Sequence, residues 1–115
     1  MLIQLTNRAS KPNPKKVFYS YSHRDEIFKV RIDEHMSVLK TDGFIDSWND
    51  RMIRPGDEWD GIIDDHINMA DLILLLISPS FMASKYCQDI EVKRAMERHE
   101  AGEARVIPII LRQVV

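Results

Sequence analysis

Four short hydrophobic clusters divide the chain, and each has the pattern of a β-strand. The run Leu72–Ile77 is apolar at every position, is too short to span a membrane and is typical of a strand buried on both faces. Val17–Ser22, Phe44–Trp48 and Arg105–Leu111 are rich in β-branched, aromatic or other apolar residues and predict three further strands. A strand without a polar face requires helices on both sides of its sheet.

The segments between these strands have the composition and spacing of amphipathic helices. Their expected limits are Ser22 or Asp25 and Gly43 for the first helix, Asp57 and Ala70 for the second, and Lys85 and Gly102 for the third. The apolar faces defined by the spacing are Phe28, Ile32, Met36 and Leu39, and then Trp59, Ile62, Ile63, Ile67 and Ala70. Ser78 can cap a helical start at Pro79. Strands that alternate with helices predict an α/β fold with a doubly wound parallel sheet.

Length, composition and charge place the chain among ordinary globular domains. It has 115 residues, 44% of them hydrophobic and 30% charged, and a net charge of -2. Because Lys and Arg are scattered, we expect neither nucleic acid nor an anionic membrane as a partner. One cysteine excludes an internal disulfide, and the first residues lack the pattern of a signal peptide, so we expect a cytoplasmic location.

The organisation expected from these patterns is a leader or linker over residues 1–15 and one domain over residues 16–115. The chain stops shortly after its last predicted strand. Because a doubly wound domain normally covers such a strand with another helix, we expect a C-terminally truncated domain whose last helix is missing.

Several kinds of chemistry can be set aside from the sequence. No glycine-rich phosphate loop and no Gly-x-Ser-x-Gly elbow is present, and the four histidines lack metal-ligand spacing, so no metal is expected. Cys87 has no recognisable histidine partner and is interpreted as a structural thiol. Carboxylates remain, and Glu91 stands out because it lies four residues after Cys87 on one helix face, beside apolar neighbours that would desolvate it.

Five short motifs occur in order along the chain and are more specific than its composition. They are Lys16–Ser22, Arg54–Asp57, Ile77–Phe81, Ser84–Cys87 with Glu91, and Val106–Leu111. Together they resemble a Toll/interleukin receptor (TIR) domain of the bacterial type over roughly residues 16–112. The resemblance implies a flavodoxin-like sheet. It also implies an interaction loop that contacts other TIR domains, formed by Arg51, Arg54, Pro55, Gly56 and Asp57.

The resemblance implies one of two functions. Many bacterial TIR domains cleave NAD, as a substrate and without a cofactor, at the nicotinamide–ribose bond with one glutamate on the third helix. Glu91, followed by Val92, matches that glutamate, and Asp89 is the competing carboxylate. Nicotinamide leaves as a neutral group, so one carboxylate suffices to stabilise the oxocarbenium-like ribose. The alternative is a non-catalytic adaptor that assembles with other TIR domains.

Residues that could bind NAD lie after the first strand and near the third helix. Tyr21, Trp48 and Tyr86 could stack on the bases, with core packing as the alternative, which is favoured for Trp48. Ser22, His23 and Arg24 could contact phosphate or ribose, and a helix-capping turn explains them equally well. A receiver-type regulator is disfavoured because Asp50 is poorly placed for phosphorylation.

Overall fold

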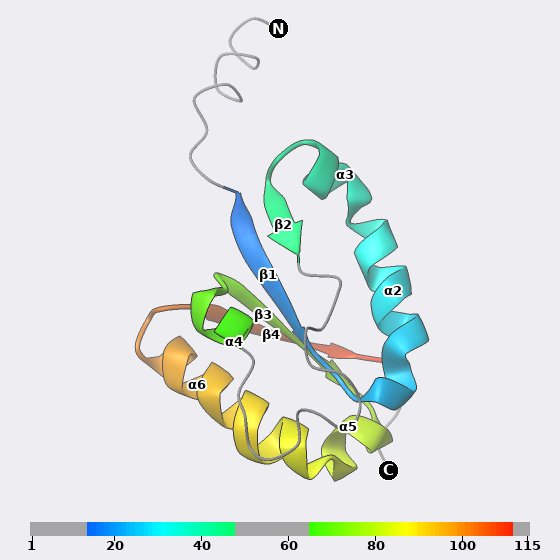
Figure 1. The fold of residues 1–115 in the computed structure, drawn as a ribbon, viewed down its shortest axis with the longest axis vertical. Coiled ribbons are helices and arrows are strands. Elements are labelled where there is room, and N and C mark those ends of the chain that lie inside the picture. The colour runs from blue at the N-terminus through cyan, green and yellow to red at the C-terminus, as the bar shows by residue number, and fades with distance from the viewer. Residues whose placement is uncertain (1–13, 48–64, 112–115) are drawn as a thin grey trace, which may run out of the picture.

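The computed structural model describes residues 14–47 and 65–111, which build a parallel sheet between helices (Figure 1). The strands are β1 (Lys15–Ser20), β2 (Ile45–Ser47), β3 (Leu72–Ile77) and β4 (Arg105–Ile110). Their order in the sheet is β2-β1-β3-β4, and every neighbouring pair is parallel. This order, with the first strand between the second and third, is that of flavodoxin-like folds and confirms the predicted fold class.

Helices cover both faces of this sheet. They are the 3-10 turn η1 (His23–Asp25), α2 (Glu26–His35), α3 (Ser37–Thr41), α4 (Asp65–Met69), α5 (Pro79–Ala83), the π-helix η2 (Cys87–Val92) and α6 (Lys93–Glu100). In Figure 1, α2 and α3 lie on one side of the sheet and α4 and α6 on the other, while α5 lies near the start of α2. The described residues contain no helix after β4, because they end at residue 111.

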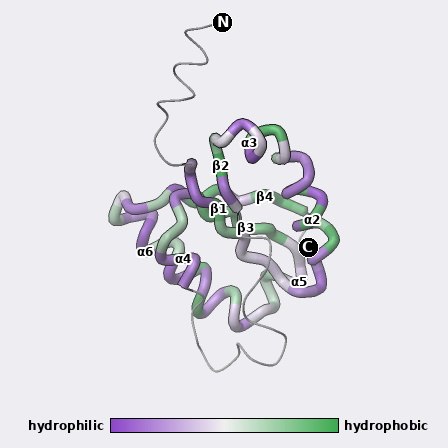
Figure 2. Tube along the Cα trace, turned by 45° about the horizontal axis from the view of Figure 1, so that its top comes forward, coloured by the Kyte–Doolittle hydropathy of each residue, from purple (hydrophilic) through white to green (hydrophobic). Residues whose placement is uncertain are grey.

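The core consists of two apolar clusters, one on each face of the sheet. Phe18, Ile73 and Leu75 point to the side of α4 and α6, whereas Val17, Leu74 and Leu76 point to the side of α2. Alternating side chains of β3 therefore enter different clusters, which confirms its predicted burial on both faces. Figure 2 shows the hydrophobic stretches of the trace in the central strands and polar residues along α6.

The structure corrects several predicted boundaries. The first strand ends at Ser20, before the predicted Ser22, because the Ser22 hydroxyl accepts the N–H of Arg24 and begins η1. The helix predicted from Lys85 does begin at that residue, but it continues as the π-helix η2 before α6. Ser78 caps the separate helix α5 through the N–H of Phe81, as its position before Pro79 predicts. The ends predicted at two glycines are correct, with positive φ angles at Gly43 and Gly102.

The inner face of α2 differs from the prediction. Leu39, expected to be buried on the same helix, lies on the separate helix α3 and is 42% exposed, whereas the buried residues of α2 are Lys29 and Asp33. Within this mainly apolar face, the Tyr19 and Ser47 hydroxyls offer donors to Asp33. The Asp33 carboxylate accepts hydrogen bonds from Tyr19 at 2.8 Å, Ser47 at 2.7 Å and Lys40 at 2.6 Å. These bonds tie α2 to both β1 and β2 and satisfy the buried charge.

We expect this cluster to make stability depend on pH in the acid range. Burial raises the pKa of Asp33, but the hydrogen bonds from Lys40, Ser47 and Tyr19 outweigh it and hold the pKa below the ordinary value of 3.8. A carboxyl with a depressed pKa stabilises the fold above its unfolded pKa, and the contribution is lost as pH falls through the folded pKa. The free energy of unfolding, measured by urea titration, should therefore fall as pH drops below about 4.

The matched variants for this prediction are Asp33→Asn and Glu34→Gln, which remove adjacent carboxylates on the same helix. Asp33 is buried, whereas Glu34 is exposed. Asp33→Asn should lower stability at neutral pH and flatten its fall on acidification. Glu34→Gln should leave both unchanged. If the free energy of unfolding fell equally with decreasing pH in the wild type and in Asp33→Asn, the role given to this carboxylate would be contradicted.

Candidate functional site

The π-helix η2 is held in place at the carboxyl end of the sheet. Its first residue, Cys87, places Sγ 3.5 Å from the carbonyl oxygen of Tyr21 and donates its N–H to Ser84 Oγ. The amide of Gln88 donates to the carbonyl of Phe81 at 3.1 Å. Runs of π-helix are rare and frequently occur at functional sites. These contacts fix η2 against the segments that follow β1 and β3.

Glu91 of η2 points into the protein. Its exposed fraction is 0%, and its Oε1 accepts a 2.7 Å hydrogen bond from the hydroxyl of Ser20, whose exposed fraction is also 0%. Asp89, the competing carboxylate, lies on the same π-helix but is exposed to solvent. The two acids are therefore in opposite environments, and a desolvated carboxylate with a specific partner is the stronger candidate for chemistry.

Ser20, the hydrogen-bond partner of Glu91, is not among the residues predicted for the site. It is the last residue of β1, and its side chain lies on the same face as that of Phe18. That face is covered by η2 and α6, which is why Ser20 meets Glu91. A polar residue on the core face of a predicted strand is the signal that could have drawn attention to it.

A second buried pair connects the two loops at this edge of the sheet. The Ser78 hydroxyl donates to Oδ2 of Asp25, and both residues are fully buried. Ser78 also accepts the N–H of Phe81, so one side chain joins η1 to the start of α5. A groove of about 510 Å³ lies over this junction. Its lining residues are Ser22, Arg24, Pro79, Ser80, Ala83 and Ser84.

The structure brings together some of the predicted substrate-binding residues. Ser22 and Arg24 line the groove, although Ser22 also has the capping role given as its alternative. His23 is exposed on η1. Tyr21 is only 2% exposed and donates its hydroxyl to Glu26 at 2.5 Å, so its ring is packed in the core.

The remaining predicted residues are placed less centrally or lie outside the described residues. Tyr86 is half-buried and directly precedes η2. Trp48 lies outside the described residues. So does the predicted interaction loop, which consists of Arg51, Arg54, Pro55, Gly56 and Asp57.

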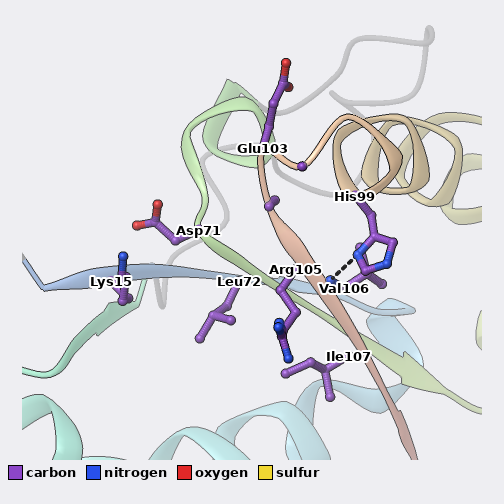
Figure 3. Close-up of a pocket in the computed structure, with 10 residues that line it drawn as sticks. Lys15, Asp71, Leu72, His99, Glu103, Arg105, Val106 and Ile107 are labelled. Atoms are coloured by element: carbon purple, nitrogen blue, oxygen red, sulfur yellow. Dashed lines mark hydrogen bonds between the residues drawn. The ribbon is translucent and has the colours of Figure 1, made fainter.

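A larger groove, of about 770 Å³, lies at the opposite edge of the sheet, where β3 and β4 begin (Figure 3). His99 at this groove accepts the N–H of Val106 on Nδ1 at 3.2 Å. Figure 3 shows that Glu103 and Arg105 point to opposite sides. These two charged side chains thus do not converge on one point, and we do not assign the candidate chemistry to this groove.

Comparison with known proteins identifies the family of this domain. The sequence model of the TIR domain matches residues 17–115. The chain is a TIR domain. This confirms the resemblance carried by the five sequence motifs, and the flavodoxin-like sheet agrees with it.

One protein of similar sequence and one solved structure resemble this TIR domain. It is 56% identical over 96 residues to the uncharacterized protein y4lF of Sinorhizobium fredii (strain NBRC 101917 / NGR234). That match covers 84% of this chain but only 30% of the relative, so the chain spans less than a third of that protein's length. The crystal structure of the TIR domain of the Toll-related receptor TRR-2 from Hydra magnipapillata shares the fold. The TM-score is 0.59 at 22% identity, over 86% of this chain and 72% of that one.

Neither a membrane-spanning helix nor a cluster of metal ligands is found in the described part of the TIR domain. Among the helices of residues 14–47 and 65–111, none has the length and apolar character needed to cross a membrane. The same part of the chain brings together no group of three His, Cys, Asp or Glu side chains that could bind a metal ion.

Proposed function

We propose that this TIR domain cleaves NAD at the nicotinamide–ribose bond, with Glu91 as the catalytic carboxylate. The observation that carries the proposal is the fully buried Glu91 on a π-helix, bonded to Ser20 at the end of β1. The carboxyl ends of parallel strands are where open α/β sheets bind their ligands. The groove between η1 and α5, lined by Ser22 and Arg24, lies at the same edge and offers a cationic side chain for the NAD pyrophosphate.

The reaction needs one ionised carboxylate beside the ribosyl centre, and Glu91 can supply it. The bond between ribose C1′ and the nicotinamide nitrogen breaks, and its electron pair neutralises the cationic ring. The ribosyl centre that remains carries positive charge, which an ionised Glu91 stabilises directly. Water then attacks C1′ and loses a proton to give ADP-ribose, or the adenine ring attacks to give a cyclic product. No acid is needed to protonate the leaving group, unlike ordinary glycoside hydrolysis.

Self-assembly is the condition that we propose for activity. Because Glu91 has no exposed surface in this structure, NAD can reach the carboxylate only after a rearrangement that uncovers it. Contacts between TIR domains, through the predicted loop from Arg51 to Asp57, would supply the free energy for that change. The proposed setting is the cytoplasm, in bacterial defence or signalling, with NAD and further TIR domains as partners.

Nicotinamide release is the direct test of this function. The purified domain is incubated with NAD at low concentration, and again after clustering on a multivalent scaffold, and the products are separated by chromatography. We expect slow release from the dispersed protein and a rate per domain at least about tenfold higher after clustering, because a larger fraction is then in the competent state. Absence of nicotinamide in both states would reject the proposal.

A non-catalytic adaptor is the second candidate. It applies if Glu91 stays buried after assembly, because NAD cannot then reach the carboxylate. The same samples separate the two functions. An adaptor would form concentration-dependent oligomers in sedimentation velocity without any turnover of NAD.

A further inference from the structure

We propose that Ser20 is the positioning residue of this site, and that it orients the Glu91 carboxylate for NAD cleavage. This inference rests on the proposed function. Ser20 and Glu91 are 71 positions apart in the chain, yet Ser20 Oγ lies 2.7 Å from Glu91 Oε1. Both side chains have an exposed fraction of 0%, so water does not compete for this hydrogen bond.

The two partners differ in the structure that supports them. Ser20 ends β1, a central strand of the sheet, and is paired there with Leu75 of β3. Glu91 lies in η2, whose π-helical turns depend on contacts with neighbouring segments. The sheet therefore fixes the position of the Ser20 hydroxyl, and the hydrogen bond from this hydroxyl holds the Glu91 carboxylate in place.

Packing alone does not explain a serine at this position. Phe18 and Leu75 on the same face belong to the apolar cluster, and an alanine would occupy the site without a polar group. A buried hydroxyl is unfavourable unless it is hydrogen-bonded, and the bond to Glu91 satisfies it. The distinct property of serine here is its O–H donor, which can point at one oxygen of the carboxylate.

The bond has two consequences for the reaction. It restricts the rotation of the carboxylate, so that its charge lies in one place relative to the ribosyl centre, and small misplacements of such groups have large effects on rate. It also favours the ionised form of Glu91 over the protonated form. Because Ser20 acts through Glu91 and not on NAD, its loss should lower kcat and leave KM nearly unchanged.

The test compares Ser20→Ala, Ser20→Thr and the control Ser47→Ala in the clustered protein. Ser47 also donates a 2.7 Å hydrogen bond to a carboxylate, but to Asp33 on the other side of the sheet. We expect Ser20→Ala to lower kcat by about 10- to 100-fold with KM within about twofold, and to move the acid limb of the pH–rate profile to higher pH. Ser20→Thr should recover part of kcat, and Ser47→Ala should keep the wild-type value. An unchanged kcat in Ser20→Ala, or a change in KM alone, would overturn the proposal.

A second measurement separates this inference from the proposed function. Glu91 is followed by carbon-13 NMR of carboxyl-labelled glutamate, with its signal assigned from Glu91→Gln. In folded Ser20→Ala, the midpoint of its titration should move to higher pH, because the hydrogen bond that favours the ionised form is absent. An unmoved midpoint would overturn the inference even if NAD is cleaved. A moved midpoint without NAD cleavage by the wild type would reject the proposed function and leave the Ser20–Glu91 coupling intact.

Discussion

Replacement of Glu91 by glutamine should reduce nicotinamide release by at least about a hundredfold, whereas Asp89→Asn should keep it within about twofold. Glutamine retains the size of the side chain and an oxygen that can accept the Ser20 hydroxyl, but it has no negative charge. The decrease in the rate of nicotinamide release therefore measures how much the negative charge of Glu91 stabilises the ribosyl centre. Rates are measured on clustered protein at saturating NAD, so that binding does not limit them.

The pair of variants is informative because both acids lie on η2 in opposite environments. Asp89 is exposed, and solvent screens its charge, whereas Glu91 is desolvated and bonded to Ser20. Circular dichroism and thermal unfolding of each variant show whether the fold is retained. Full activity in folded Glu91→Gln would refute the assignment of this carboxylate, and a large loss in Asp89→Asn would transfer it to the competing acid.

Arg98→Ala should lower the free energy of unfolding by roughly 2–4 kcal/mol, because it leaves buried carbonyl oxygens without a donor. The Arg98 side chain is 9% exposed. Its guanidinium donates to the carbonyls of Ile67 at 2.8 Å and Ala70 at 2.6 Å, at the end of α4, and to that of Glu103 at 3.1 Å. One cation thus binds the carboxyl end of α4 to α6 and to the segment before β4.

Arg94→Ala is the matched control for Arg98→Ala, since both arginines lie on α6. The Arg94 side chain is 37% exposed, pairs with Glu97 at 3.3 Å and donates to Asn68 Oδ1 at 2.6 Å. These contacts are exposed, and such an ion pair contributes about 0–1 kcal/mol. In a domain of this size each kcal/mol shifts Tm by roughly 4–8 °C. Urea unfolding and calorimetry should place Arg98→Ala well below both Arg94→Ala and the wild type. Similar values for the two variants would contradict a structural role for the buried guanidinium.

The fold could be predicted because its signals are local. The apolar run Leu72–Ile77 predicts a strand covered on both faces, and that is the burial of β3. Gly43 and Gly102 predict helix ends that the structure shows at positive φ. The prediction for α2 was less accurate because apolar spacing ignores polar partners. The buried Asp33 carboxylate accepts hydrogen bonds from two hydroxyl groups and one ammonium group that belong to other helices and strands.

The candidate site could be predicted only in part. Family motifs indicate Glu91, but the sequence alone does not separate it from Asp89. The π-helix that carries both depends on contacts of Cys87 with Tyr21 and of Gln88 with Phe81. The contact of Cys87 with Tyr21 joins residues 66 positions apart in the chain, so no local pattern predicts it, whereas Gln88 and Phe81 are separated by only 7 positions. Ser20 was not predicted because its partner Glu91 lies 71 positions away in the chain.

By itself, the sequence determined the parallel α/β class of this protein and its membership of the TIR family, because hydrophobic period and motif order are properties of neighbouring residues. Only the tertiary structure decided which acid is buried and which group holds it. Parallel pairing of β1 with β3 and the docking of η2 bring Ser20 to Glu91 across 71 positions of chain. The burial of Ser20 and Glu91 follows from the register of the strands and from the helices packed on the sheet. Both depend on several segments of the chain together, so neither can be read from one segment alone.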